Sequence, residues 1–385
     1  MKQIKYLPLL IILTLSALFL DACSYSVQVL TTPLAPVSDP TVTALPPTPI
    51  VASPTAALSA SATPTLISIR VDTLNMLEIF NSLDLQESVR SLAFTPDGSA
   101  LAAAGGDTED FAIHIWDVAS GQKIGVLGGH SGIVWNVAFS PDGQMLASVS
   151  SDGTAKIWDW RNGDILKILD FPDQVGSVSF SPDGQTLAVG GLDDLQNLRA
   201  AIWIFSTSSW QPLLKIPESI NITALSYTPN GRWLVGGGAS RNVQVWRTSD
   251  GTSMFTLNHA HQVLDVTIAP DSSTAATATC GITLNDECTE GSVWLWDLST
   301  GKLINRLADF PDVVENVAFS TDGSSLIATS RDGTLRVYDT VNYEPQFEAD
   351  PPGGNGVMAL SPDGGLLATG GVNGEVRLWK IVYRP

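Results

Sequence analysis

Few residues of this sequence have the types and spacing that catalysis or metal binding requires. The chain has three cysteines, Cys23, Cys280 and Cys288, and four histidines. Two thiols without matched His or Cys partners rarely make a metal site, and we interpret His259 and His261, which share a loop, as surface polar residues. The sequence contains no G-x-S-x-G, no phosphate-binding loop and no H-E-x-x-H. It therefore predicts a protein that is not an enzyme and has no catalytic, cofactor-binding or metal-binding residues.

Two segments are rich in acidic side chains, GGDTEDFA with Asp107, Glu109 and Asp110, and GLDDLQN with Asp193 and Asp194. Calcium takes oxygen ligands, but neither segment has the regular ligand spacing of a calcium loop. We interpret both as solvated loops, and leave calcium open as the alternative.

The charge balance bears on the class of partner. The formal net charge is −19, with 20 Lys and Arg residues in 385. Binding to phosphates requires a basic footprint, so we expect no nucleic-acid partner. An acidic excess of this size favours solubility and repulsion from anionic surfaces.

The first residues, MKQIKYLPLLIILTLSALFLDACSYS, indicate an exported protein. Lys2 and Lys5 precede the apolar run 6–20, which is short for a hydrocarbon core of about 30 Å and suits the core of a signal peptide. The segment Leu20-Asp21-Ala22-Cys23 resembles a bacterial lipobox. The resemblance implies that residues 1–22 are a signal peptide and that a lipidated Cys23 anchors the protein to the outer face of a bacterial membrane. Ordinary secretory cleavage and an uncleaved anchor remain as alternatives.

The segment that follows is rich in Pro, Thr, Ala and Ser and has no hydrophobic period. Such a composition cannot bury enough apolar surface to offset the entropy of ordering. We therefore predict a disordered stalk over residues 23–70, between the anchor and a folded domain over residues 71–385.

The rest of the chain is built from one repeat. Seven turns of the type SPDG or TPDG, each between two strand-like segments, predict seven hairpins; they begin at Thr95, Ser140, Ser181, Thr228, Ala269, Ser320 and Ser361. An aromatic residue closes the third strand-like segment of each repeat, at Trp116, Trp158, Trp203, Trp246, Trp296, Tyr338 and Trp379.

These repeats resemble the WD-repeat family over roughly residues 75–383. The resemblance implies an all-β fold, a seven-bladed β-propeller with four antiparallel strands in each blade around a central channel. The second repeat matches best: His130, Ser148, Asp152 and Trp158 stand where the family has its hydrogen-bonded structural tetrad. Elsewhere the tetrad is degraded, and we expect the other blades to be held mostly by apolar packing.

An outer strand follows the aromatic residue in six repeats, but not in the last. The segment NMLEIFNSLDL, residues 75–85, has the same character and belongs to no complete repeat. Because open sheet edges are a liability, we predict that this N-terminal strand completes the last blade and closes the ring.

The longest repeat contains TCGITLNDECTEGS. Cys280 would end one strand and Cys288 would precede the next. In an exported protein this arrangement predicts a disulfide between them, with mainly local ordering as its effect.

The family resemblance also indicates where partners dock: on the face with the loops that precede the first strand of each blade. The candidate residues are Arg90, Trp135, Leu264 and Glu315, a mixture enriched in binding hot spots. Alternatively, Trp135 caps the channel or packs between blades. We expect a monomeric propeller that acts as a non-catalytic scaffold for an unidentified protein. A ligand- or glycan-binding sensor that uses the channel mouth is the alternative, and a propeller hydrolase is a weaker one.

Overall fold

The structure is a computed structural model. It describes residues 74–85, 88–106, 111–194, 196, 199–218, 222–238, 241–284, 287–349 and 356–383. The chain divides into two units, Met1–Ala62 and Thr63–Pro385, and all described residues belong to the second. The predicted signal peptide, the stalk, Cys23 and the acidic residues 107–110 lie outside them.

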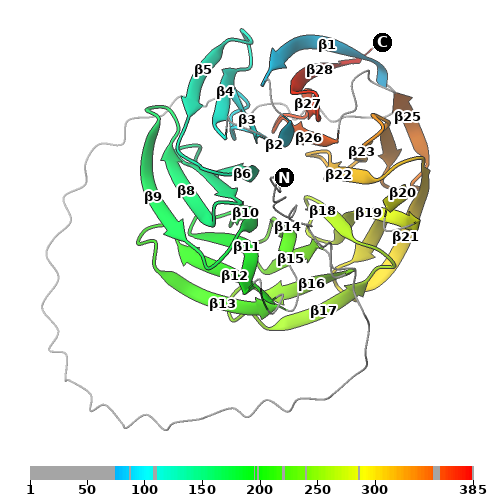
Figure 1. The fold of residues 1–385 in the computed structure, drawn as a ribbon. Helices are drawn as coiled ribbons and strands as arrows, with labels where there is room; N and C mark the ends of the chain where they lie inside the picture. The colour runs from blue at the N-terminus through cyan, green and yellow to red at the C-terminus, as the bar shows by residue number, and fades with distance from the viewer. Residues whose placement is uncertain are drawn as a thin grey trace, which may run out of the picture. The chain divides into compact units, whose positions relative to one another are not determined.

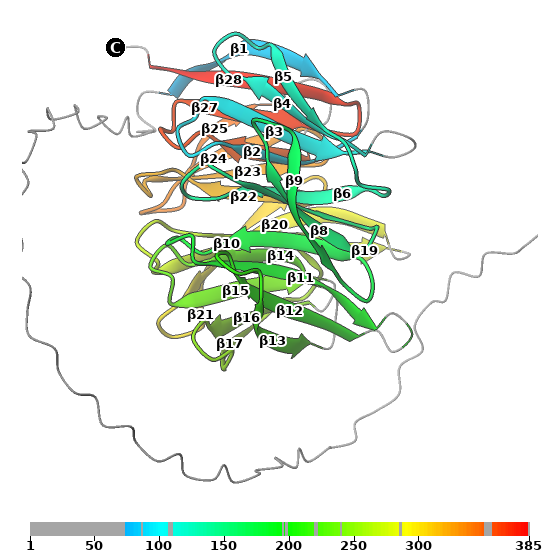
Figure 2. The same ribbon diagram turned by 90° about the vertical axis from the view of Figure 1, so that its left-hand side faces the viewer.

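The described residues form seven four-stranded antiparallel sheets, the blades, which are arranged in a ring (Figure 1) and are seen from the side in Figure 2. In chain order, the strands of blades 1 to 4 are β2 (Val89–Phe94), β3 (Ala100–Gly105), β4 (Ile113–Asp117), β5 (Lys123–Leu127); β6 (Val134–Phe139), β7 (Leu146–Ser150), β8 (Thr154–Asp159), β9 (Asp164–Asp170); β10 (Val175–Phe180), β11 (Thr186–Asp194), β12 (Arg199–Ser206), β13 (Pro212–Glu218); β14 (Ile222–Tyr227), β15 (Trp233–Gly238), β16 (Asn242–Arg247) and β17 (Ser253–Asn258). Those of blades 5 to 7 are β18 (Val263–Ile268), β19 (Thr274–Leu284), β20 (Glu287–Asp297), β21 (Lys302–Phe310); β22 (Val314–Phe319), β23 (Ser325–Ser330), β24 (Leu335–Asp339), β25 (Pro345–Ala349); β26 (Val357–Leu360), β27 (Leu366–Gly370) and β28 (Glu375–Tyr383).

Blade 7 is completed by the strand β1 (Leu74–Asp84) from the other end of the folded unit. Strand β1 pairs antiparallel with β28, from Leu74 opposite Tyr383 to Asp84 opposite Glu375, and the two run side by side at the top of Figure 1. The predicted closure is confirmed. Strand β1 covers the outer edge of β28 and gives blade 7 the four strands that the other blades have.

The repeated turn between the first two strands of a blade is locally encoded. In blade 1 the Thr95 hydroxyl donates to Asp97 Oδ1 at 2.6 Å, and the Ser99 amide donates to the same oxygen at 3.0 Å. These bonds lower the pKa of Asp97 to about 2. Gly98 follows with a φ of 71°, a conformation that favours glycine.

The turns also touch one another around the ring. A β-carbon on Gly143 would lie 3.4 Å from Cδ of Pro96 in the preceding blade, and the same distance separates such a carbon on Gly323 from Pro270. That distance is ordinary van der Waals contact, so what disfavours other residues at these glycines is their positive φ, 68° at Gly143 and 73° at Gly323.

The predicted tetrad of blade 2 forms a chain of hydrogen bonds. His130 Nδ1 donates to Asp152 Oδ2 at 2.8 Å, and His130 Nε2 accepts from Ser148 Oγ at 2.7 Å. The Trp158 indole donates to Ser148 Oγ at 2.8 Å. Burial lowers the pKa of His130 and would raise that of Asp152, but bonds to Asp152 from Thr154, Ser131 and His130 hold its pKa well below the usual value.

The other blades are held mostly by apolar clusters, as expected, and three of them add a hydrogen bond from an indole. Trp246 donates to Glu218 Oε1 at 3.1 Å, and Trp379 donates to Thr369 Oγ1 at 2.8 Å. In blade 5 Trp296 donates to His259 Nε2 at 3.2 Å.

Two predictions about single residues were wrong. His259 is not a surface residue: it is 8% exposed, and its Nδ1 donates to the Leu257 carbonyl oxygen at 3.0 Å. In blade 3 the aromatic position belongs to Phe205, which lies opposite Leu187 as Trp158 lies opposite Leu146. Trp203 precedes it by two residues on the same face and contacts Phe171, with ring centroids 4.9 Å apart.

Candidate binding site at the channel mouth

The first strand of each blade lies innermost in the ring (Figure 1), and six of these strands share one irregularity. In each, the register with the second strand skips the second residue of the first strand, which leaves that residue out of the ladder as a β-bulge. Bulges re-aim the side chain that they carry. The residues at the skipped positions are Arg90, Trp135, Gly176, Thr223, Leu264 and Glu315.

All six line a single cavity of about 420 Å³. The structure therefore brings together the four predicted residues, Arg90, Trp135, Leu264 and Glu315. We call this cavity the channel mouth. Trp135 is half-buried and lines the mouth, a position open to a partner.

Two charged contacts shape the rim of the channel mouth. The Arg90 guanidinium carbon lies 5.7 Å from the centre of a Trp135 ring, which is a cation–π contact. Arg331 Nε lies 2.8 Å from Glu315 Oε1; both side chains are partly exposed, so this ion pair contributes little to stability. The Glu315 carboxylate lies over Gly356, where an added β-carbon would overlap it.

In four of the bulged blades, the residue after the bulge connects one blade to the next at the channel mouth. In each, a side-chain oxygen at this position accepts the backbone N–H of the following inner strand, at 2.9–3.2 Å. The acceptors are Ser91, Asn136, Asp265 and Asn316, and the corresponding donors are Val137, Val178, Val317 and Met358.

Asp265 differs electrostatically from the other three acceptors. Burial raises its pKa to about 6, although bonds from the Val317 and Val266 amides act in the opposite direction. The residue as a whole is half-buried because part of it faces the channel. Among the described residues no Lys, Arg or His forms an ion pair with it.

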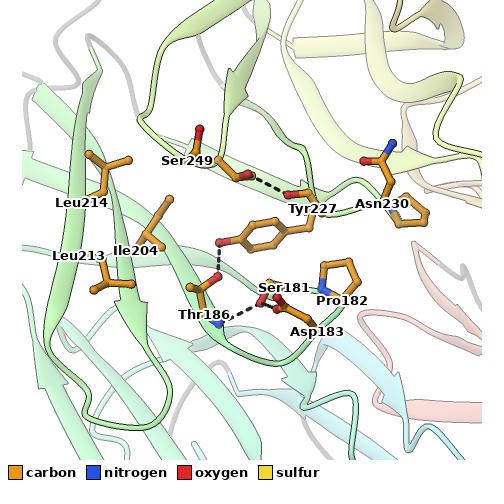
Figure 3. Close-up of a pocket in the computed structure, with 13 residues that line it drawn as sticks. Ser181, Pro182, Asp183, Thr186, Ile204, Leu213, Leu214, Tyr227, Asn230 and Ser249 are labelled. Atoms are coloured by element: carbon orange, nitrogen blue, oxygen red, sulfur yellow. Dashed lines mark hydrogen bonds between the residues drawn. The ribbon is translucent and has the colours of Figure 1, made fainter. Parts of the chain in front are cut away.

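A second cavity, of about 610 Å³, lies between blades 3 and 4 (Figure 3). It borders Thr186, at a repeat position where blade 2 has Met145 and blade 4 has Trp233, so a short side chain leaves space there. The Tyr227 hydroxyl lies 3.0 Å from Thr186 Oγ1, and burial raises the pKa of Tyr227 to about 12. A phenol this weakly acidic is a poor general acid or base near neutrality.

The other predicted sites are resolved only in part. Within the described ranges there is no group of three or more His, Cys, Asp or Glu residues that could hold a metal ion. Asp193 of the second acidic segment pairs with Lys215 Nζ at 2.7 Å. Cys280 is 1% exposed and disulfide-bonded, but the side chain of Cys288 lies outside the described residues, so the pairing of these two cysteines stays a prediction. The part of the chain that the structure describes has no helix able to cross a membrane.

Comparison with known proteins decides the family. The family described as "WD domain, G-beta repeat" matches residues 81–117, 121–159, 163–195, 210–247, 301–339 and 350–380. The chain belongs to the WD40 repeat family. No matched segment covers residues 248–300, which hold the first three strands of blade 5. Blade 5 nevertheless has four strands, as the other blades of the WD40 propeller do.

Relatives of this WD40 protein are distant. It is 24% identical over 307 residues to Apoptotic protease-activating factor 1 of Rattus norvegicus, covering 70% of this chain and 24% of that protein, so it spans about a quarter of that relative's length. It is 22% identical over 302 residues to Eukaryotic translation initiation factor 3 subunit I of Nematostella vectensis, covering 76% of this chain and 93% of the relative. The subunit I of Drosophila melanogaster is 23% identical over 310 residues, with coverage of 76% and 93%.

Two charged residues of the channel mouth were not predicted, Asp265 and Arg331. Alignment of the repeats could have indicated Asp265, because it stands directly after Leu264 as Asn136 stands after Trp135 and Asn316 after Glu315. Arg331 lies between the second and third strands of blade 6, and only the folded blade brings it to the mouth.

Proposed function

We propose that this WD40 propeller is a non-catalytic scaffold that binds a protein partner at its channel mouth. The observation that carries the proposal is that six bulged residues from six blades line one cavity. The subunit I relatives are, by name, components of a larger factor, which also favours a role in assembly.

The composition of the channel mouth suits a protein partner. Trp and Arg are the residues most enriched in binding hot spots, and Trp135 and Arg90 stand together at the rim. Two of the three side-chain amides at the channel mouth, those of Asn136 and Asn316, already make hydrogen bonds within the propeller. Asn136 donates to Ser91 Oγ and Asn316 donates to the Glu315 carbonyl oxygen, and both accept a backbone N–H from the next blade.

The proposal is tested by capture of crosslinked partners from membranes with the wild-type chain, Trp135→Ala and Leu213→Ala. Leu213 is 60% exposed and borders the second cavity, not the channel mouth, so it is a matched control. We expect the wild type and Leu213→Ala to capture the same proteins and Trp135→Ala to lose them. Equal capture by all three chains would refute binding at the mouth.

We further propose that the propeller is exported and held at a membrane by a lipid on Cys23, with the stalk as spacer. The support is the basic start, the apolar run 6–20 and the Ala22-Cys23 pair. Radiolabelled palmitate should enter the wild type and not Cys23→Ser, and equal labelling would contradict the anchor.

An oxidising compartment would also favour the disulfide between Cys280 and Cys288. Mass spectrometry of the protein after alkylation without reductant should show neither cysteine modified. Alkylation of both would exclude the disulfide.

A further inference from the structure

Asp265 accepts a backbone hydrogen bond from the next blade, and this contact does not require a charged side chain. Its Oδ2 accepts the Val317 amide at 3.0 Å, and Asn316 performs the same task one blade later through its amide oxygen at 2.9 Å. Asn136 does so in blade 2. Asparagine and aspartate have nearly the same shape, so the aspartate differs from its counterparts chiefly in its charge.

A buried carboxylate without a cation is costly, and such groups are normally paired. Asp265 has no ion-pair partner among the described residues, and its pKa of about 6 reflects burial without a compensating charge. A carboxylate offers about four acceptor positions, of which the amides of Val266 and Val317 use two. The Asp265 carboxylate can therefore accept further hydrogen bonds from a group in the cavity.

The other charged groups of the channel mouth each contact a neighbouring side chain. They are Arg90 from β2, Glu315 from β22 and Arg331 from the turn after β23. Arg331 pairs with Glu315, and Arg90 lies over Trp135. Among the described residues, Asp265 is therefore the carboxylate of the channel mouth that has no ion-pair partner.

The remaining lining suits a long side chain with a charged end. Trp135 and Leu264 offer apolar surface for methylene groups. Thr223 Oγ1 is buried and finds no hydrogen-bond partner among the described residues, so it can accept from an N–H donor. A cavity of about 420 Å³ has room for one such side chain.

We propose that the channel mouth binds a cationic side chain of the partner protein, a lysine ammonium or an arginine guanidinium, with Asp265 as its counter-ion. The inference rests on the proposed function and specifies the chemistry of the partner. Protonation of Asp265 removes the counter-ion, so binding weakens as the pH falls below about 6.

The test uses the full-length chain in detergent and calorimetric titration with three probes: acetyl-Gly-Lys-Gly-amide, its norleucine counterpart and butylammonium. We expect the lysine peptide to bind about tenfold more tightly at pH 7.5 than at pH 5, because a group with a pKa near 6 is about one-tenth ionised at pH 5. At pH 7.5 the norleucine peptide should bind at least about tenfold more weakly than the lysine peptide does. Equal binding of the two peptides overturns the proposal, and butylammonium binding as tightly as the lysine peptide overturns its assignment to a protein side chain.

Asp265→Asn should lose both the preference for lysine and the pH dependence, whereas Asp173→Asn, outside the channel mouth, should keep both. Because Asn fits the matching position in two other blades, loss of binding cannot be attributed to misfolding if the variant unfolds at the same or a higher urea concentration. If Asp265→Asn keeps the preference, the proposal is overturned. If it also captures the partner that Trp135→Ala loses, the scaffold function stands without a cationic contact.

Discussion

Replacing Asp265 by asparagine should stabilise the propeller, and by an amount that depends on pH. The pKa of the folded carboxyl is about 6, against 3.8 for the ordinary group. The folded state therefore holds the proton more tightly than the unfolded chain. The contribution of Asp265 to the free energy of unfolding therefore falls as the pH rises from about 4 to about 6. Above about pH 7 the folded carboxyl is fully ionised, and the loss of stability reaches its full value.

The magnitude follows from the same two values. A difference of about two pH units, at about 1.4 kcal/mol each, sets an upper limit of about 3 kcal/mol. Because Asp265 is half-buried and faces the channel, water reduces this, and we expect about 1–2 kcal/mol at pH 7.5. Asparagine keeps the bond from the Val317 amide, as Asn316 keeps the bond from Met358.

The assay is urea unfolding of the wild type and Asp265→Asn at several pH values between 4 and 8. The two proteins should be nearly equally stable at pH 4, and the difference between their free energies of unfolding should grow as the pH rises. The reciprocal variant, Asn316→Asp, is the control: it should lose stability at pH 7.5 and recover most of it at pH 4. A destabilised Asp265→Asn at pH 7.5, or a difference independent of pH, would refute the reasoning.

Three further predictions concern the ring and its hydrogen bonds. Deleting residues 75–85 should lower the melting temperature sharply, because β28 loses its partner strand; removal of the stalk is the control and should not. Ser148→Ala should cost about 1–3 kcal/mol in chemical denaturation, since His130 Nε2 and the Trp158 indole both lose their partner, whereas an unchanged midpoint would show that the tetrad is dispensable. Burial lowers the pKa of His259 to about 4, so its share of the stability, up to about 3 kcal/mol, should be lost as the pH falls from about 6.5 to about 4. His259→Gln should remove this part of the pH dependence, and an unaltered profile would contradict it.

Much of the fold could be predicted because its signals are local. The turn at Thr95 is closed by the side chains of Thr95 and Asp97 and by the φ of Gly98, all within a few residues. The aromatic position was misassigned only in blade 3. There Trp203 and Phe205 lie two residues apart on one face of β12, and side chains alternate along a strand with a period of two. Only the pairing of Phe205 with Leu187 distinguishes them.

The acceptors in the tetrad-like networks were harder to predict. Glu218 and His259 both stand where His130 does in blade 2, yet the sequence indicated a polar partner for an indole only in blade 2. A single buried indole N–H can be satisfied by a hydroxyl, a carboxylate or an imidazole. Which of these reaches Trp246 or Trp296 depends on how each blade packs.

The sequence by itself determined the repeat, the number of blades, the closing strand and the face on which Arg90, Trp135, Leu264 and Glu315 lie, because turn chemistry and strand periodicity act over a few residues. Only the tertiary structure decided that these side chains line one cavity, that bulges direct them there and that Asp265 is buried without a cation. Burial is a collective property. The groups that enclose Asp265 come from blades that are far apart in the chain, and they meet only when the ring is closed.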